Sequence, residues 1–254
     1  MKHLTIGLFG YGKTGSIVAQ EIIKDTNLKL CWVMRNSDMN EGEYASRLLG
    51  FPDDEGRIYC VSNTNFNTFY EQNKVDVIID FSSNCSVNEY KTAAKSGIRI
   101  VSAISNYDEN NFEQLKALSE ETAVLYSPNI TLGINFLIKA SKLFKKVVPG
   151  ADISIVEEHF REKKFVSGTA LQIAQDLEIN SDEHVKSIRV GGIVGTHEVI
   201  FGLPNQTIRI KHESLNRAAF GQGAIYAAKW IMCKEKNMYS MEEAVASLMS
   251  SEYL

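Results

Sequence analysis

One segment of the chain, residues 157–170, concentrates side chains that can transfer protons and bind anions. It contains His159 and Lys163, with Ser167-Gly168-Thr169 near its end. A histidine or lysine beside a bound imine can donate a proton as hydride arrives. The Ser167 and Thr169 hydroxyls, with the exposed N–H groups of a helix start, are typical of a carboxylate site. A lone histidine at a strand end is more often structural, but these neighbours favour a catalytic role.

A glycine-containing turn near the N-terminus has the pattern of a dinucleotide site. It follows an apolar run and opens a helical pattern, which is the context that such a motif requires. Glycine permits the tight turn and the close approach of backbone to a pyrophosphate, which the helix N-terminus attracts. A merely structural turn is the alternative, because strand-to-helix turns often contain glycine. The turn consists of Gly10, Tyr11, Gly12, Lys13, Thr14 and Gly15.

Arg35 lies about 20 residues past Gly15, where an acidic side chain would bind a ribose hydroxyl of NADH. An arginine suits the 2′-phosphate of NADPH instead. The sequence therefore predicts NADPH as the preferred cofactor and leaves NADH open, and a solvated arginine at a strand end is the alternative. The segments 80–83 and 102–105 end two further predicted strands, at the carboxyl edge where such sheets bind ligands.

The elements that position the turn fill the first 130 residues, where apolar runs alternate with helical patterns. This order predicts β-α-β units and a doubly wound parallel sheet, a Rossmann-type α/β fold. The run 75–81 is the strongest strand, because it is rich in β-branched residues. The predicted strands are 4–9, 28–34, 57–61, 75–81, 98–102 and 123–126, and the predicted helices are 17–23, 66–73, 87–96 and 110–120.

The pattern changes after residue 129, which predicts a second, smaller α+β domain. We expect domain bounds of 1–129 and 130–220, with helices in 221–254 packing back on the first domain. Short connections between the last three strands predict an antiparallel meander. The predicted strands are 152–159, 188–194, 198–203 and 206–213, and the predicted helices are 133–147, 168–177, 221–233 and 239–254.

Composition excludes several classes of protein. The 254 residues are 44% hydrophobic and 23% charged, which is ordinary for a globular protein. The net charge of −4 argues against a nucleic-acid partner, because that binding needs a basic surface. No run of about 18 apolar residues could span a membrane, and we expect a cytoplasmic protein. The four scattered cysteines form no metal-ligand pattern and predict reduced thiols, so no metal is expected.

Several motifs in the same order resemble the dihydrodipicolinate reductases of bacterial lysine and diaminopimelate biosynthesis. The resemblance spans nearly the whole chain, which makes it far more specific than any single motif. It rests on the glycine turn 10–15, Asp80-Phe81-Ser82-Ser83, the Ser-Pro-Asn segment 127–135, the hairpin 192–201, and the C-terminal residues His212, Arg217, Phe220, Gly223, Ala224 and Trp230.

The resemblance implies a homotetrameric reductase, built through its second domain, that transfers hydride from NAD(P)H to an anionic cyclic imine dicarboxylate. It implies that His159 donates the proton and that Lys163 acts beside it near the substrate. The implied substrate-binding residues are Phe160, Ser167, Gly168, Thr169 and Arg217. The residues implied to position the nicotinamide are Phe81, Ser82, Ser102, Ala103, Ser105, Ser127 and Asn129.

The substrate segment departs from the family pattern. The family's second consecutive histidine is Phe160 here, and Phe165-Val166 replaces an Asp-x-Pro sequence with one residue fewer. Phenylalanine cannot hydrogen-bond, so one polar contact to a dicarboxylate is lost. Three interpretations stay open: a divergent reductase of the usual pathway, a reductase retuned to another cyclic imine, and a catalytically weak dinucleotide-binding sensor.

Overall fold

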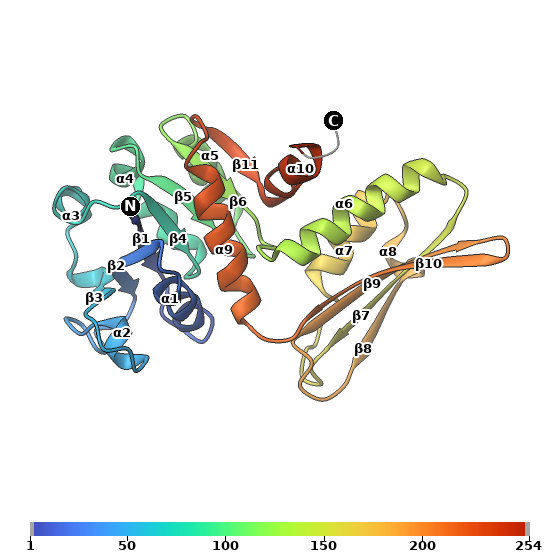
Figure 1. The fold of residues 1–254 in the computed structure, drawn as a ribbon, viewed down its shortest axis with the longest axis horizontal. Helices are drawn as coiled ribbons and strands as arrows, with labels where there is room; N and C mark the ends of the chain where they lie inside the picture. Colours follow the sequence, from blue (N-terminus) through green and yellow to red (C-terminus); the bar gives the residue numbers. More distant parts are fainter. Residues whose placement is uncertain (1–2, 252–254) are drawn as a thin grey trace. The chain divides into compact units, whose positions relative to one another are not determined.

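The computed structural model describes residues 3–251, and they divide into two compact units (Figure 1). The first unit runs to Ile130 and also includes Phe220–Ala244. The second unit contains Thr131–Ala219 and resumes at Val245. The last helix therefore begins in the first unit and continues in the second, whereas the sequence assigned all of 221–254 to the first. Residues 252–254 of the predicted final helix lie outside the described residues.

The first unit is built on a parallel sheet, which within the described residues has seven strands in the order β11-β6-β5-β4-β1-β2-β3. This arrangement confirms the predicted Rossmann-type fold class. Its central strands are mostly apolar because both faces are covered, as parallel sheets require. The strands are β1 (Leu4–Phe9), β2 (Leu28–Arg35), β3 (Arg57–Cys60), β4 (Val77–Asp80), β5 (Arg99–Ser102), β6 (Ala123–Tyr126) and β11 (Asn237–Ser240).

Helices cover the sheet of the first unit. In α1, Val18, Ala19 and Ile22 recur at helical spacing and are fully buried. An aromatic cluster around Trp32 and Phe9 fills part of the core. The helices are α1 (Gly15–Lys24), α2 (Ala45–Leu48), η1 (Val61–Asn63), α3 (Phe66–Gln72), η2 (Asn84–Asn88), α4 (Lys91–Lys95), α5 (Glu109–Leu118), α9 (Ala218–Ile231) and α10 (Met241–Ser251).

The second unit is a mixed sheet with helices on one face. Along strand β7, buried residues alternate with residues that are half-buried or, at Asp152, exposed. Ile153 and Ile155 on the buried face pack against α6 and α7. The strand order is β10-β9-β7-β8. The elements are α6 (Leu132–Val147), β7 (Asp152–His159), α7 (Gly168–Asp176), α8 (Ser181–His184), β8 (Val185–Arg189), β9 (Gly195–Leu203) and β10 (Gln206–Ser214).

Two details of the predicted topology are wrong. Strand β8 pairs with β7 in parallel, not with β9, so only β9 and β10 form the predicted antiparallel hairpin. The intervening helix α7 provides the crossover that a parallel pair needs. The predicted helix at 239–254 is preceded by β11, which adds a parallel strand beside β6. In the part of the chain that the structure describes, no helix is both long enough and apolar enough to cross a membrane.

Candidate active site

Two glycines shape the turn between β1 and α1. Gly10 has a φ of +94°, and a Cβ there would lie 2.8 Å from the carbonyl oxygen of Phe81. A Cβ on Gly15 would lie 2.0 Å from the Gly10 carbonyl oxygen. Neither position accepts a side chain without a shift of backbone. Glycine is therefore required here by geometry, and the turn brings α1 up against the ends of β1 and β4.

A pocket of about 320 Å³ opens above this turn. Gly12 lines it, and a Cβ on Gly12 would meet no protein atom within 4 Å. The N-terminus of α1 has no acidic residue in its first turn and no side-chain cap, so its dipole is available to an anion. The lining residues are Gly10, Tyr11, Gly12, Arg35, Asn36, Ser37, Phe81, Ser82 and Ser83.

Arg35 ends β2 and lines this pocket. Its guanidinium lies 6.0 Å from the centre of the Tyr11 ring. Its Nε is buried and has no hydrogen-bond partner among residues 3–251, and no carboxylate there forms an ion pair with it. A buried donor without a partner is costly, so the position suits an anionic ligand.

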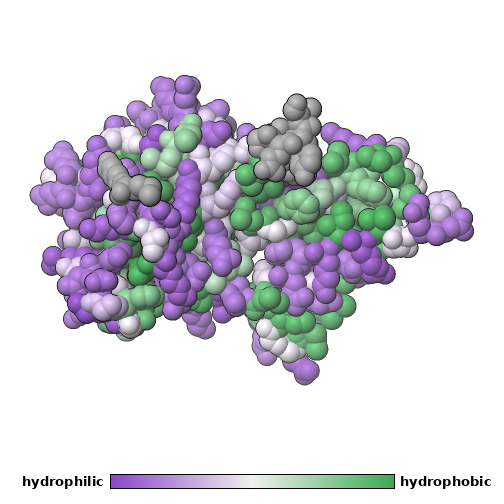
Figure 2. Space-filling model, in the orientation of Figure 1, coloured by the Kyte–Doolittle hydropathy of each residue, from purple (hydrophilic) through white to green (hydrophobic). Residues whose placement is uncertain are grey.

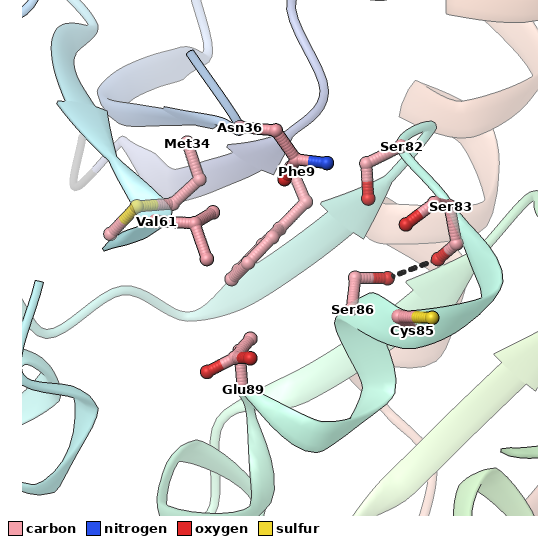
Figure 3. A pocket seen from close by; sticks show the side chains of 9 residues that line it. All are labelled: Phe9, Met34, Asn36, Val61, Ser82, Ser83, Cys85, Ser86 and Glu89. Carbon is pink, nitrogen blue, oxygen red and sulfur yellow. Dashed lines mark hydrogen bonds between the residues drawn. The ribbon is translucent and has the colours of Figure 1, made fainter. Parts of the chain in front are cut away.

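A second cavity, of about 100 Å³, adjoins the first and shares Asn36, Ser82 and Ser83 with it (Figure 3). Its inner wall is apolar, with Phe9, and the Glu89 side chain stands at the far end. The remaining lining residues are Met34, Val61, Cys85 and Ser86.

Asp80 organises the strand ends beside these cavities, although the sequence assigned it no role. Its carboxylate is fully buried and accepts hydrogen bonds from the Ser82 amide (2.8 Å), from Ser86 Oγ and from Tyr90 Oη (3.0 Å). Tyr90 contacts Tyr107, whose hydroxyl lies 2.9 Å from Ser102 Oγ. Burial raises the pKa of Asp80, while these hydrogen bonds oppose the shift.

The other predicted cofactor residues do not line these two cavities. Lys13 and Ser105 are exposed, and Thr14 and Ala103 are half-buried. Ser127 is buried, and its hydroxyl donates to the carbonyl oxygen of Asn129 at 2.8 Å.

A separate polar cluster lies at the end of the sheet in the second unit. His159 and Glu157 are two residues apart on β7, so both point to its buried face. His159 Nδ1 lies 2.5 Å from Glu157 Oε2, and the Glu157 carboxylate is fully buried. Strand register places Ser187 of β8 and His197 of β9 directly beside Glu157.

Arg189 completes this cluster. It is the register partner of His159, and it binds both oxygens of Glu157, with Nη2 2.6 Å from Oε1 and Nη1 2.9 Å from Oε2. Ser187 Oγ (2.6 Å) and the Ser167 amide (3.2 Å) also donate to Oε1. Burial by itself raises the pKa of Glu157, but these hydrogen bonds prevail and lower it to about 2.

Burial lowers the pKa of both histidines of the cluster. Burial lowers the pKa of His159, and the Lys163 and Arg189 charges add to this, while Glu157 opposes it. Burial also lowers the pKa of His197, to about 3, and nearby His159 contributes. His197 Nε2 lies 2.8 Å from Ser167 Oγ, and the two imidazole rings are 5.4 Å apart.

Ser167 therefore turns inward. Its amide binds Glu157 and its hydroxyl contacts His197, so both groups serve the cluster. Helix α7 begins immediately after it, at Gly168, which is exposed, and Thr169 is half-buried.

The remaining predicted substrate residues lie at the surface or near it. Lys163 is half-buried, and its burial lowers its pKa. Phe160 is 40% exposed. Arg217 is exposed in the loop between β10 and α9, and among the described residues it takes no part in the hydrogen bonds of the Glu157 cluster.

Comparison with known families matches the entire two-unit architecture. The model "Dihydrodipicolinate reductase, N-terminus" matches residues 4–130, and "Dihydrodipicolinate reductase, C-terminus" matches residues 131–245. The chain belongs to the dihydrodipicolinate reductase family. The family consists of oxidoreductases, and the predicted resemblance is confirmed.

Individual relatives agree with this family assignment. The chain is 37% identical to 4-hydroxy-tetrahydrodipicolinate reductase of Caldanaerobacter subterraneus over 68% of this chain and 77% of that one. It is 26% identical to the Pelagibacter ubique reductase over 96% and 98% of the two chains. Among solved structures, a dipicolinate-bound dihydrodipicolinate reductase from Paenisporosarcina has the same fold, with a TM-score of 0.78, 22% identity, and coverage of 95% and 99%.

Sequence reasoning found His159, Lys163 and Ser167 in this reductase chain but assigned no role to the other residues of the cluster, namely Glu157, Ser187, Arg189 and His197. Glu157 could have been recognised, because Ile153, Ile155, Glu157 and His159 share the same side of a strand. A carboxylate on an otherwise apolar face is a signal of a buried polar cluster. Ser187, Arg189 and His197 carry no such signal, since only strand register brings them to Glu157.

The pKa shifts of the cluster predict acid sensitivity. His197 has a pKa of about 3 in the fold against 6.5 ordinarily, so the unfolded chain binds its proton first and stability falls as pH falls from 6.5 to 3. The expected loss of folding free energy from His197 is on the order of 5 kcal/mol. The pKa of Glu157 is lowered from 4.5 to about 2, so this carboxyl adds a further loss of stability as pH falls between those values. Urea unfolding at a series of pH values would measure this.

The variant His197→Gln is the control for this pH dependence. It removes one titrating group, so the free energy of unfolding should vary less between pH 6.5 and 3 than in the parent protein. An unchanged slope would show that His197 does not stay neutral in the folded state.

Proposed function

We propose that this protein reduces 4-hydroxy-tetrahydrodipicolinate to tetrahydrodipicolinate with NAD(P)H and a proton, in lysine and diaminopimelate biosynthesis. The 4-hydroxyl group leaves as water, and the cofactor becomes NAD(P)+. The relatives matched over most of their length are named for this reductase. The observation that carries the proposal is His159, held through Nδ1 by a fully buried carboxylate inside the matched C-terminal region. A protein that only bound dinucleotide would have no need of this arrangement, which disfavours a sensor role.

The first unit provides a site that fits a nicotinamide dinucleotide. The cofactor, when bound, supplies hydride. The amides at the start of α1 and the open space over Gly12 suit the pyrophosphate. An engineered D-amino acid dehydrogenase bound to NADP+ and a scyllo-inositol dehydrogenase bound to NAD(H) have related folds, with a TM-score of 0.58 in each case. The other cofactor residues predicted from sequence remain proposals.

NADPH is the proposed preferred cofactor, because Arg35 has a buried Nε without a partner among the described residues. Replacing Arg35 with alanine is expected to weaken NADPH binding roughly tenfold, a loss of about 1.4 kcal/mol for a charge-assisted contact. NADH binding should change little. Fluorescence titration with both cofactors measures this, and an equal loss for the two would show that Arg35 does not bind the 2′-phosphate.

The second unit provides the proposed chemistry. The Glu157 carboxylate is ionised, so it accepts the proton on His159 Nδ1 and leaves Nε2 for exchange with substrate. A bound dianion raises the pKa of a nearby imidazole, which favours the protonated form that can donate. The Lys163 charge lowers the pKa of His159, so we assign Lys163 to the negative charge of the substrate beside it. Because Ser167 turns inward, we assign the substrate carboxylates to Gly168, Thr169 and Arg217.

A retuned substrate is a second candidate, favoured by the apolar surface beside His159. Phe160, Phe165 and Val166 are 40%, 79% and 42% exposed. A cyclic imine with one carboxylate fewer, or with a bulkier apolar part, would suit these side chains.

A homotetramer formed through the second unit also remains a proposal. Figure 2 shows hydrophobic residues gathered over α6, where Phe136, Leu143 and Val147 are exposed. Exposed apolar residues of this kind are typical of a protein–protein interface. The cytoplasmic location stays a prediction.

Following NADPH oxidation with the product of dihydrodipicolinate synthase as substrate tests the function. We expect turnover with that product. Turnover only on other cyclic imines would favour the retuned reductase, and cofactor binding without turnover on any of them would favour a sensor.

A further inference from the structure

Arg189 connects the two groups to which the proposed chemistry is assigned. Toward β7, its guanidinium binds both oxygens of Glu157. Toward the segment 160–167, its Nε donates to the carbonyl oxygen of Lys163 at 3.0 Å, and its Nη2 donates to the carbonyl oxygen of Phe165 at 2.9 Å. One planar group therefore fixes the orienting carboxylate and the backbone at Lys163 together.

The orientation of the His159 ring depends on the position of Glu157, which Arg189 holds. With Nδ1 engaged by Glu157, the ring presents Nε2 toward Gly195, where an added Cβ would lie 3.1 Å from that nitrogen. Two backbone hydrogen bonds just after Arg189 support the same region. Val190 N donates to the His159 carbonyl oxygen, and Arg161 N donates to the Gly191 carbonyl oxygen. Rotation of the imidazole away from this position would break its contact with Glu157.

We propose that Arg189 is a positioning residue for the reduction: it holds Glu157 so that the His159 ring keeps Nδ1 on that carboxylate and Nε2 on its opposite side, and it holds the backbone at Lys163 beside it. The inference rests on the proposed function. Arg189 acts through these neighbours and is not itself assigned a contact with substrate.

Lysine cannot replace arginine in this role. Glu157 takes two parallel N–H bonds from a rigid fork, and the backbone carbonyls take others from the same plane. An ammonium group keeps the charge but cannot form all four bonds in this geometry. If only the charge of Arg189 matters, lysine will suffice, and if its geometry matters, lysine will fail.

The variants Arg189→Lys and Arg189→Met test this, with Arg209→Met as the matched control. Arg209 pairs with Glu198 at 3.2 Å on the same sheet, outside the cluster. We expect kcat to fall at least tenfold in Arg189→Lys and further in Arg189→Met, with unchanged NADPH affinity and with Arg209→Met like the parent. Wild-type kcat in Arg189→Lys would overturn the proposal. If Arg189→Met does not fold, Arg189→Lys alone decides.

Nitrogen-15 NMR of the histidines gives a readout that does not depend on turnover. The charged or titratable groups facing His159 are Glu157 on its own strand, Arg189 on β8, His197 on β9 and Lys163 in the following segment. We expect one Nδ1–H tautomer for His159 in the parent and a mixture in Arg189→Lys. An unchanged tautomer would overturn the positioning role, even if no substrate were turned over. Absence of turnover in the parent would instead count against the proposed function.

Discussion

Replacing His159 with glutamine is expected to lower kcat by about 10²–10⁴-fold, the usual contribution of a positioned general acid. Glutamine keeps hydrogen-bonding capacity near Glu157 but cannot donate a proton as imidazolium does. NADPH affinity should stay unchanged, because the cofactor residues that we propose all belong to the first unit. Steady-state kinetics and a separate cofactor titration measure the two quantities.

The control for this prediction is His3→Gln, which changes an exposed histidine of the first unit. Its kinetics should match those of the parent. If His159→Gln instead retained its kcat and lost only cofactor affinity, the assignment of His159 as the proton donor would be wrong.

The second large effect is expected at the glycine turn. A Cβ on Gly15 would lie 2.0 Å from the backbone oxygen of Gly10, and no side-chain rotation can relieve that contact. Gly15→Ala should therefore destabilise the protein by about 3 kcal/mol, as overpacking does when backbone must move. It should also abolish NADPH binding, since the turn itself is displaced.

The variant Gly12→Ala tests the effect of this turn on NADPH binding separately from its effect on protein stability. A Cβ there meets no protein atom within 4 Å, so thermal unfolding should match that of the parent protein. Its added methyl group would project from a residue that lines the pocket, so NADPH affinity should fall. Parent-like NADPH binding by Gly12→Ala would show that the cofactor does not approach this backbone.

Local sequence patterns predicted much of the fold because they depend on neighbouring residues alone. The turn at Gly10 and Gly15 could be predicted, since backbone geometry there demands glycine whatever surrounds it. Strand β4 was equally clear from its β-branched residues. Strand β11 was missed because its four residues run directly into α10, and only pairing with β6 makes them a strand.

Contacts between distant segments could not be predicted in this way. Arg189 fell in a strand predicted to pair with β9, and that register would have kept it from Glu157. The parallel pairing of β8 with β7 brings the two together across 32 residues of sequence. His197 reaches Ser167 through the insertion of β9 beside β7, which likewise depends on tertiary packing.

Isotope transfer tests the central claim most directly. The protein would be supplied with NADPH deuterated at either C4 position of the nicotinamide, together with the product of dihydrodipicolinate synthase, and tetrahydrodipicolinate would be examined by mass spectrometry. We predict that one of the two labelled cofactors delivers one deuterium to each product molecule. Oxidation of both cofactors without deuterium in the product would contradict direct hydride transfer to this substrate.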